Sequence, residues 1–332
     1  MVKFILMRVG SLVLSLTLAS FVIFVLIELP PGDYAERYVF KQAAAGVTLT
    51  EQDIISLRHQ LGLDAPFGQR YLKWVSGIVL HGNFGVSFQY QQPVLDVIGE
   101  RLVYTFILAT ASLLITYGLA IPIGIISAIY QYSVGDILAT VMGYIGLAVP
   151  SFLLALTLMY FSVKYLDTSV GGLFSPEYVT APWSWAKFMD LLKHLWVPAF
   201  VLGMSGTAFQ IRTVRAMMLD EKNKLYVKVA RAKGISEWQT LLRYPVRVAL
   251  NPIASTIGWE LANIISGAPI VATVLSLPDT GPLLLTALLD QDMYLAGAML
   301  LMLTFLTVVG TFVSDVLLAL LDPRVRLGRV AH

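Results

Sequence analysis

The longest uncharged segment of this chain restricts its fold more than any other feature. Between Arg101 and Asp136 lie 34 consecutive residues without a charged side chain. A helix needs about 20 apolar residues to cross a bilayer, whereas strands of a membrane barrel have about 10 residues of alternating polarity. The segment therefore predicts a membrane-spanning helix, and Pro122 and Gly124 predict a kink inside it.

Five further segments are strongly apolar, and two of them contain a single acid each, Glu260 and Asp315. They are residues 9–27, the stretch between Asp136 and Lys164, the 17 residues between His194 and Arg212, residues 248–275 and residues 293–321. Residues 9–27 are longer than the apolar core of a cleaved signal, so we interpret them as a retained first span. Charged residues make up only 13% of the chain, against about 25% in soluble domains. The sequence predicts an all-α integral membrane protein with six transmembrane helices.

Basic residues predict the orientation of these spans. The loop at 212–247 and the C-terminal tail are rich in Lys and Arg, whereas residues 277–292 contain none but carry Asp279, Asp290 and Asp292. Because cytoplasmic loops are enriched in basic residues, we expect both termini and the 212–247 loop in the cytoplasm. The expected organisation is a first helix at 1–29, an extracytoplasmic segment at 30–100 and a five-helix core at 101–332.

Several functional classes find no support in the sequence. The chain has no cysteine, only four scattered histidines and no HExxH motif, so we expect no metal site and no bound cofactor. A net charge of +2 gives no reason to expect nucleic acid. No nucleophile, base or metal constellation suggests a membrane enzyme.

The sequence of the loop at 212–247 predicts a pair of short helices. Residues 225–233 favour a helix, and Gly234 fits the left-handed position just past its end. Ser236 fits the N-cap of a second helix, with Gln239 completing a capping box and Glu237 favouring the helix dipole. A basic loop held by anionic lipid head groups is the simpler interpretation. The defined turn between two helices favours a docking element instead.

Five segments, in order along the chain, carry a resemblance to a known family. They are Pro30-Pro-Gly-Asp33, Leu61-Gly-Leu-Asp-Ala-Pro66 with Tyr71-Leu-Lys-Trp74, Gly82-Asn-Phe-Gly85-Val-Ser87 with Pro93-Val94, Val229-Ala-Arg-Ala-Lys-Gly234-Ile-Ser236, and Leu320-Leu-Asp-Pro-Arg-Val-Arg326. Together they resemble the permease subunits of ABC importers, in the dipeptide/oligopeptide/nickel class. The chain departs from the family at Lys228, Ala272 and the segment Leu277–Gly281, which leaves the solute open among dipeptides, oligopeptides, nickel chelates, opines and oligosaccharides.

The resemblance implies a type I importer permease fold and a function in a bacterial or archaeal cytoplasmic membrane. Such a subunit forms half of a translocation path with a second permease, and an extracytoplasmic binding protein delivers the solute. Two ATPase subunits dock on the coupling loop and bind ATP and magnesium. This chain has no G-x-x-x-x-G-K-[ST], so it is not expected to be an enzyme itself. The residues that match the coupling loop are Tyr226, Val229, Ala230, Arg231, Ala232, Lys233, Gly234, Ile235 and Ser236.

Polar residues inside the spans are candidates for the path. Glu260 lies about 12 residues into the fifth predicted span, and Asn263 follows one turn later. Gln210 and Thr207 lie near the end of the fourth. A carboxylate at membrane depth is a functional candidate by default, but a structural hydrogen bond to a neighbouring helix is the alternative.

A different class of transporter would also use Glu260. A self-contained proton-coupled carrier usually needs a chain of intramembrane acids or inverted repeats. Glu260 is the one deep acid here, and no repeat is visible. This class is therefore the less favoured alternative.

Overall fold

The computed structural model of the chain describes residues 2–44, 46, 50–166 and 171–321. The C-terminal motif beyond Leu321 and the basic tail lie outside the described residues. The chain divides into two compact units, residues 1–9, 105–278 and 309–332 in the first and residues 10–104 and 279–308 in the second. The long helices α1 (Val2–Glu28), α5 (Val94–Ile129) and α13 (Met293–Leu321) contribute residues to both.

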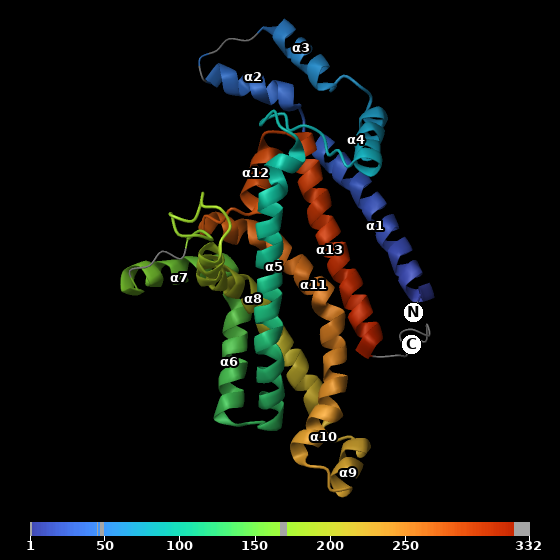
Figure 1. Ribbon diagram of the computed structural model, residues 1–332, viewed down its shortest axis with the longest axis vertical. Coiled ribbons are helices and arrows are strands. Elements are labelled where there is room, and N and C mark those ends of the chain that lie inside the picture. Colours follow the sequence, from blue (N-terminus) through green and yellow to red (C-terminus); the bar gives the residue numbers. More distant parts are fainter. Residues whose placement is uncertain (1, 45, 47–49, 167–170, 322–332) are drawn as a thin grey trace. The chain divides into compact units, whose positions relative to one another are not determined.

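The first unit is built around one long helix. α8 (Trp185–Glu221) packs against α6 (Val134–Ala148), α7 (Ser151–Leu166) and α11 (Pro245–Val274). The first unit also contains the rest of α5, which continues through Pro122. Gly124 of α5 and Gly203 of α8 allow close helix contact, because a Cβ on Gly124 would lie 2.7 Å from the Val214 side chain. The short helices α9 (Leu225–Ala232) and α10 (Glu237–Arg243) join α8 to α11 (Figure 1).

The predicted third span is not one continuous helix. α6 ends at Ala148 and α7 begins at Ser151, and the two are bent by 106°. Pro150 explains the break, because a proline pushes the preceding residue out of the helical region. Val149 accordingly has extended torsions, φ −84° and ψ 119°. The prediction overlooked this proline.

The predicted count of six spans is not confirmed. Among the described residues, four helices are long and apolar enough to cross a membrane, or five if the bent pair α6–α7 counts as one span. The predicted fourth span lies inside α8, which is not one of them. Many of its side chains are buried against neighbouring helices, so α8 behaves as the core of the first unit rather than as a uniformly apolar rod. The all-α membrane fold itself is confirmed.

The second unit contains three short helices after α1. They are α2 (Tyr34–Ala44), α3 (Glu51–Leu61) and α4 (Phe67–His81), and the unit also contains α12 (Thr280–Leu289) and the first part of α13. Its core is a buried aromatic cluster of Phe24, Tyr34, Trp74 and Phe88 with Met293.

A buried acid fixes one loop of the second unit. The Asp292 carboxylate, which is fully buried, accepts hydrogen bonds from Ser87 Oγ (2.5 Å) and from the backbone N–H of Gln89 (3.0 Å). It also accepts from the N–H of Leu295 in the first turn of α13 (3.2 Å). These bonds satisfy the carboxylate and anchor Ser87, the last residue of the Gly82–Ser87 motif, and Gln89 to the start of α13.

Candidate functional site: the α9–α10 element and the helices behind it

The turn between α9 and α10 has the geometry that the sequence predicts. Gly234 has φ +77°, in the left-handed region. Its N–H donates to Arg231 O (2.9 Å), and the N–H of Ile235 donates to Ala230 O (3.3 Å). This pair of bonds is a Schellman motif, which satisfies the last carbonyls of α9 and sets the direction of the chain into α10.

The start of α10 differs from the prediction. Ser236 occupies the N-cap, but its side chain makes no capping hydrogen bond, so the predicted capping box with Gln239 is wrong. The Schellman motif at the end of α9 sets the direction of the chain into α10, and an ion pair adds a tie between the two helices. Arg231 donates to both carboxylate oxygens of Glu237, at 2.8 and 2.6 Å. The same contact raises the pKa of the Arg231 guanidinium. The two helices are therefore tied by a bidentate pair across the turn.

The inner face of the element is fixed to the end of α8. The Tyr226 hydroxyl donates to Glu221, the last residue of α8, and Lys224 pairs with the same carboxylate at 3.1 Å. Burial, together with the hydrogen bond to Glu221, raises the pKa of Tyr226 to about 12, so the hydroxyl keeps its proton at neutral pH. Val227, Ala230 and Leu241 are buried beneath the pair.

The outer face exposes apolar and basic side chains together. Leu225, Val229, Trp238 and Leu242 are all about half exposed or more. The exposed basic side chains on the same two helices and their turn are Lys228, Lys233 and Arg243. An apolar patch with a polar rim is typical of a protein interaction surface.

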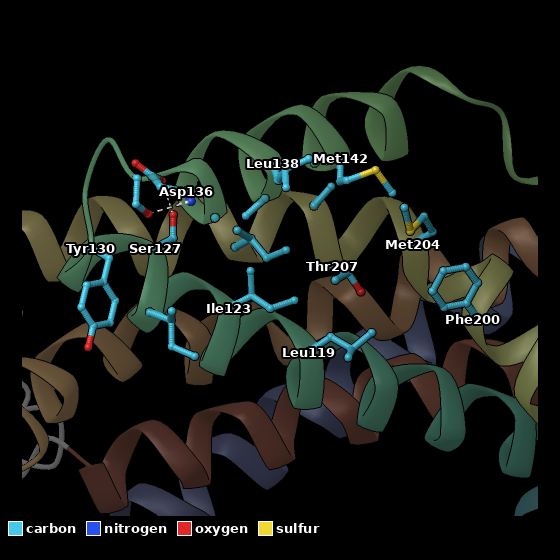
Figure 2. A pocket seen from close by; sticks show the side chains of 17 residues that line it. Leu119, Ile123, Ser127, Tyr130, Asp136, Leu138, Met142, Phe200, Met204 and Thr207 are labelled. Carbon is cyan, nitrogen blue, oxygen red and sulfur yellow. Dashed lines mark hydrogen bonds between the residues drawn. The ribbon is translucent and has the colours of Figure 1, made fainter.

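A buried ion pair behind this element was missed by the sequence analysis. Asp136 accepts from Arg215 of α8 at 2.7 Å (Nε) and 2.9 Å (Nη2). Ser127 and the N–H of Tyr132 also donate to this carboxylate, as Figure 2 shows for Ser127. The pair, together with a bond from Lys222 Nζ to Ala128 O (2.8 Å), fastens the α5–α6 turn to α8. A signal was present, because Asp136 is the single charged residue between Arg101 and Lys164.

Two of the predicted path residues meet in the interface between α8 and α11. Glu260 is 3% exposed, and its Oε1 accepts from Gln210 Nε2 at 3.1 Å. Gln210 also donates to Thr256 Oγ1 at 3.0 Å, and the Tyr117 hydroxyl lies 3.4 Å from the same oxygen. Gly206 of α8 leaves room for the Glu260 side chain. A Cβ on Gly206 would lie 2.5 Å from Glu260 Oε2.

The other two predicted path residues lie elsewhere. Thr207 donates to Gly203 O within α8 (2.8 Å) and lines an apolar cavity of about 680 Å³ between α5, α6 and α8. Figure 2 shows this cavity among Leu119 and Ile123 of α5, Leu138 and Met142 of α6, and Phe200 and Met204 of α8. Asn263 is exposed on the face of α11 that does not pack on α8. The four residues thus do not form one site within this chain.

Two family models together match nearly the whole chain. Residues 120–327 match the binding-protein-dependent transport system inner membrane component, and residues 1–109 match the N-terminal part of the same component. The chain belongs to this family. It is a multi-pass inner-membrane permease of the ABC importer type, as the motif from Val229 to Ser236 indicated.

Three relatives in this family show how far the similarity extends. A putative peptide permease protein of Brucella ovis is 32% identical, with 96% of each chain covered. The oligopeptide transport system permease protein of Bacillus subtilis is 32% identical, with 95% of each covered. The dipeptide transport system permease protein of Escherichia coli is 28% identical and covers 98% of this permease and 99% of its own length.

Proposed function

We propose that this permease forms half of the translocation path of a peptide importer, and that a second permease subunit forms the other half. A binding protein on the outer side delivers the solute, and two ATPase subunits supply the free energy by binding and hydrolysing ATP with magnesium. The names of three relatives that match along nearly the full chain support peptides as the solute. The basic 212–247 loop supports placing this loop and both termini in the cytoplasm.

The observation that carries the proposal is the way α9 and α10 are held. The pair has a fixed turn at Gly234 and a bidentate tie between Arg231 and Glu237, and its apolar outer face has no cover among the described residues. Its two ends continue into α8 and α11. A push on the outer face therefore moves both long helices as one, which a force-transmitting element requires.

The ion pair between Asp136 and Arg215 carries the movement of α8 to the α5–α6 turn. Because Asp136 and Lys222 fasten the α5–α6 turn to α8, that turn must follow α8 when α9 and α10 are displaced. The proposed mechanism is a two-state switch. ATP-driven closure of the partner ATPases shifts the α9–α10 pair and changes the path from inward-open to outward-open.

The test is transport by the reconstituted complex. Proteoliposomes holding both permeases, the ATPases and the binding protein should accumulate a labelled oligopeptide only with ATP and magnesium. Replacing Trp238 with Asp on the outer face should weaken ATPase binding, because a charge replaces an exposed aromatic anchor. Undiminished ATPase binding and uptake in this variant would contradict docking on this face.

A further inference from the structure

One face of α11 is exposed along its whole length. Between Val248 and Val274 six residues are exposed, namely Ser255, Trp259, Asn263, Ser266, Ile270 and Thr273. From the first to the last is 18 residues in five steps, which is 3.6 residues per step. This is the period of an α-helix, so the six side chains form one continuous stripe on α11.

The stripe is mostly polar, with Trp259 and Ile270 as its two apolar members, although α11 belongs to a stretch long and apolar enough to cross a membrane. Four of its six side chains are Ser, Thr or Asn, and one of them, Asn263, lies about 27 Å from the first residue of α11 and about 16 Å from the last. The Ser255 and Thr273 hydroxyls bond to carbonyls of α11 itself. Asn263 and Ser266 have no hydrogen-bond partner among the described residues.

The exposed face of α5 in the same unit is the natural comparison. Its exposed residues from 105 to 129 carry no hydrogen-bonding side chain; they are Phe106, Leu114, Gly118, Leu119, Pro122 and Ile126. Leu119 and Ile126 line the apolar cavity beside α6 and α8, and the rest of this face suits lipid. A carboxamide facing hydrocarbon without a partner is strongly unfavourable, so the α11 stripe must meet something other than acyl chains.

We propose that the α11 stripe, centred on Asn263 and Ser266, faces the water-filled path. Its side chains contact the backbone amides of the passing solute. The proposal rests on the proposed function. Carboxamide and hydroxyl groups both donate and accept hydrogen bonds, so they can exchange water for peptide N–H and C=O groups. Because the stripe carries no charge, it holds peptides of either charge weakly and releases them.

Glu260 has a different place in this arrangement. It lies on the buried face of α11, where it bonds to Gln210 of α8. The acid therefore supports the stripe from behind, and the solute meets Asn263 rather than Glu260. Glu260 and Asn263 are only three positions apart in the sequence, yet they receive different roles.

The absence of cysteine from this permease allows a direct test. Asn263→Cys and Ser266→Cys are introduced singly into the complete reconstituted transporter, alongside Leu114→Cys on the apolar face of α5 and buried Ala268→Cys on α11. Each is treated with a charged methanethiosulfonate reagent and with a membrane-soluble maleimide, without nucleotide and with trapped ATP. We expect the charged reagent to modify the two stripe positions in at least one nucleotide state, and Leu114→Cys to react only with the maleimide.

Modification at Asn263→Cys should also lower peptide uptake at least about tenfold, which corresponds to about 1.4 kcal/mol in the transport step. A stripe that reacts only with the maleimide would face lipid, and one that reacts with neither reagent in any nucleotide state would be covered by the partner permease as a subunit seam. Either result overturns the proposal. Uptake by the cysteine-free parent is measured separately, and its absence would refute the proposed function while leaving the labelling pattern to decide the stripe.

Discussion

At the scale of single residues, Gly234 has the strictest backbone requirement in the α9–α10 pair. Its φ of +77° is sterically unfavourable for side chains with a Cβ, most of all for branched ones. No atom lies within 4 Å of the position that a Cβ would take. A substitution at Gly234 therefore changes the backbone of the turn and touches nothing else.

Replacing Gly234 with Val should destabilise the turn by about 2 kcal/mol and redirect α10. We expect ATP hydrolysis by the reconstituted complex to continue while peptide uptake falls, so the ratio of uptake to hydrolysis drops. Gly234→Asn, which tolerates the left-handed region, should keep most of this ratio.

The matched control for Gly234 is Gly62. This residue ends α3 with φ +68°, and it too has no atom within 4 Å of a Cβ. Gly62→Val should carry the same backbone strain without uncoupling hydrolysis from uptake. If Gly234→Val transports normally, the proposed role of this turn is refuted.

Glu260 should tolerate Gln better than Ala. Glu260→Gln keeps an oxygen for Gln210 and the shape of the side chain. Glu260→Ala empties a buried volume and leaves the Gln210 amide without one of its acceptors, which should cost about 3 kcal/mol. Thermal unfolding of the purified complex would show this as a lower midpoint for the Ala variant alone; equal midpoints would contradict a supporting role.

At the scale of secondary-structure elements, the sequence predicts some features and misses others for identifiable reasons. The α9–Gly234–α10 turn is predictable because it depends on local backbone chemistry within about ten residues. The break between α6 and α7 was also within reach, since Pro150 dictates it. The burial of Glu260 against Gln210 was not, because it depends on a contact between residues 50 positions apart.

The clamp between the α5–α6 turn and α8 yields a test at this scale. Asp136 is 3% exposed, and its bond to Arg215 is bidentate. Asp136→Ala should lower stability by about 3 kcal/mol, because it leaves a partly buried guanidinium without its counter-charge. Asp136→Ala combined with Arg215→Met should recover part of the loss.

The exposed pair Arg231–Glu237 is the comparison for this clamp. Its side chains are 36% and 57% exposed, so removing it should change stability by less than about 1 kcal/mol. The readout is the unfolding midpoint of the complex in detergent. Equal effects of the two pairs, or no recovery in the double variant, would contradict the clamp.

At the scale of the whole molecule, the motifs identified the family before the geometry was known, and two family models confirm it across nearly the full chain. Hydropathy was a poorer guide to the number of spans. The predicted fourth span lies inside α8, which is not among the described helices that are long and apolar enough to cross a membrane, so a sixth span stays a prediction. The sequence named Glu260 and Asn263 together as path candidates, and only the fold separates them, because Glu260 is buried and Asn263 is exposed.

The purified permease alone should hydrolyse no ATP, because the proposed mechanism places nucleotide in partner subunits. Phosphate release is measured for the permease in proteoliposomes and for the complete complex with its binding protein and peptide. Only the complete complex should be active. Hydrolysis by the permease alone, at a rate that survives repurification, would refute this division of labour.

The central claim is that force from an ATPase reaches the path through α9 and α10. The most direct measurement is the uptake of a labelled oligopeptide into proteoliposomes under ATP, and separately under an imposed proton gradient. The account predicts uptake by the complete complex that needs ATP and that Gly234→Val lowers while hydrolysis continues. Uptake by this permease alone, driven by the proton gradient and lost in Glu260→Gln, would contradict it and favour a proton-coupled carrier.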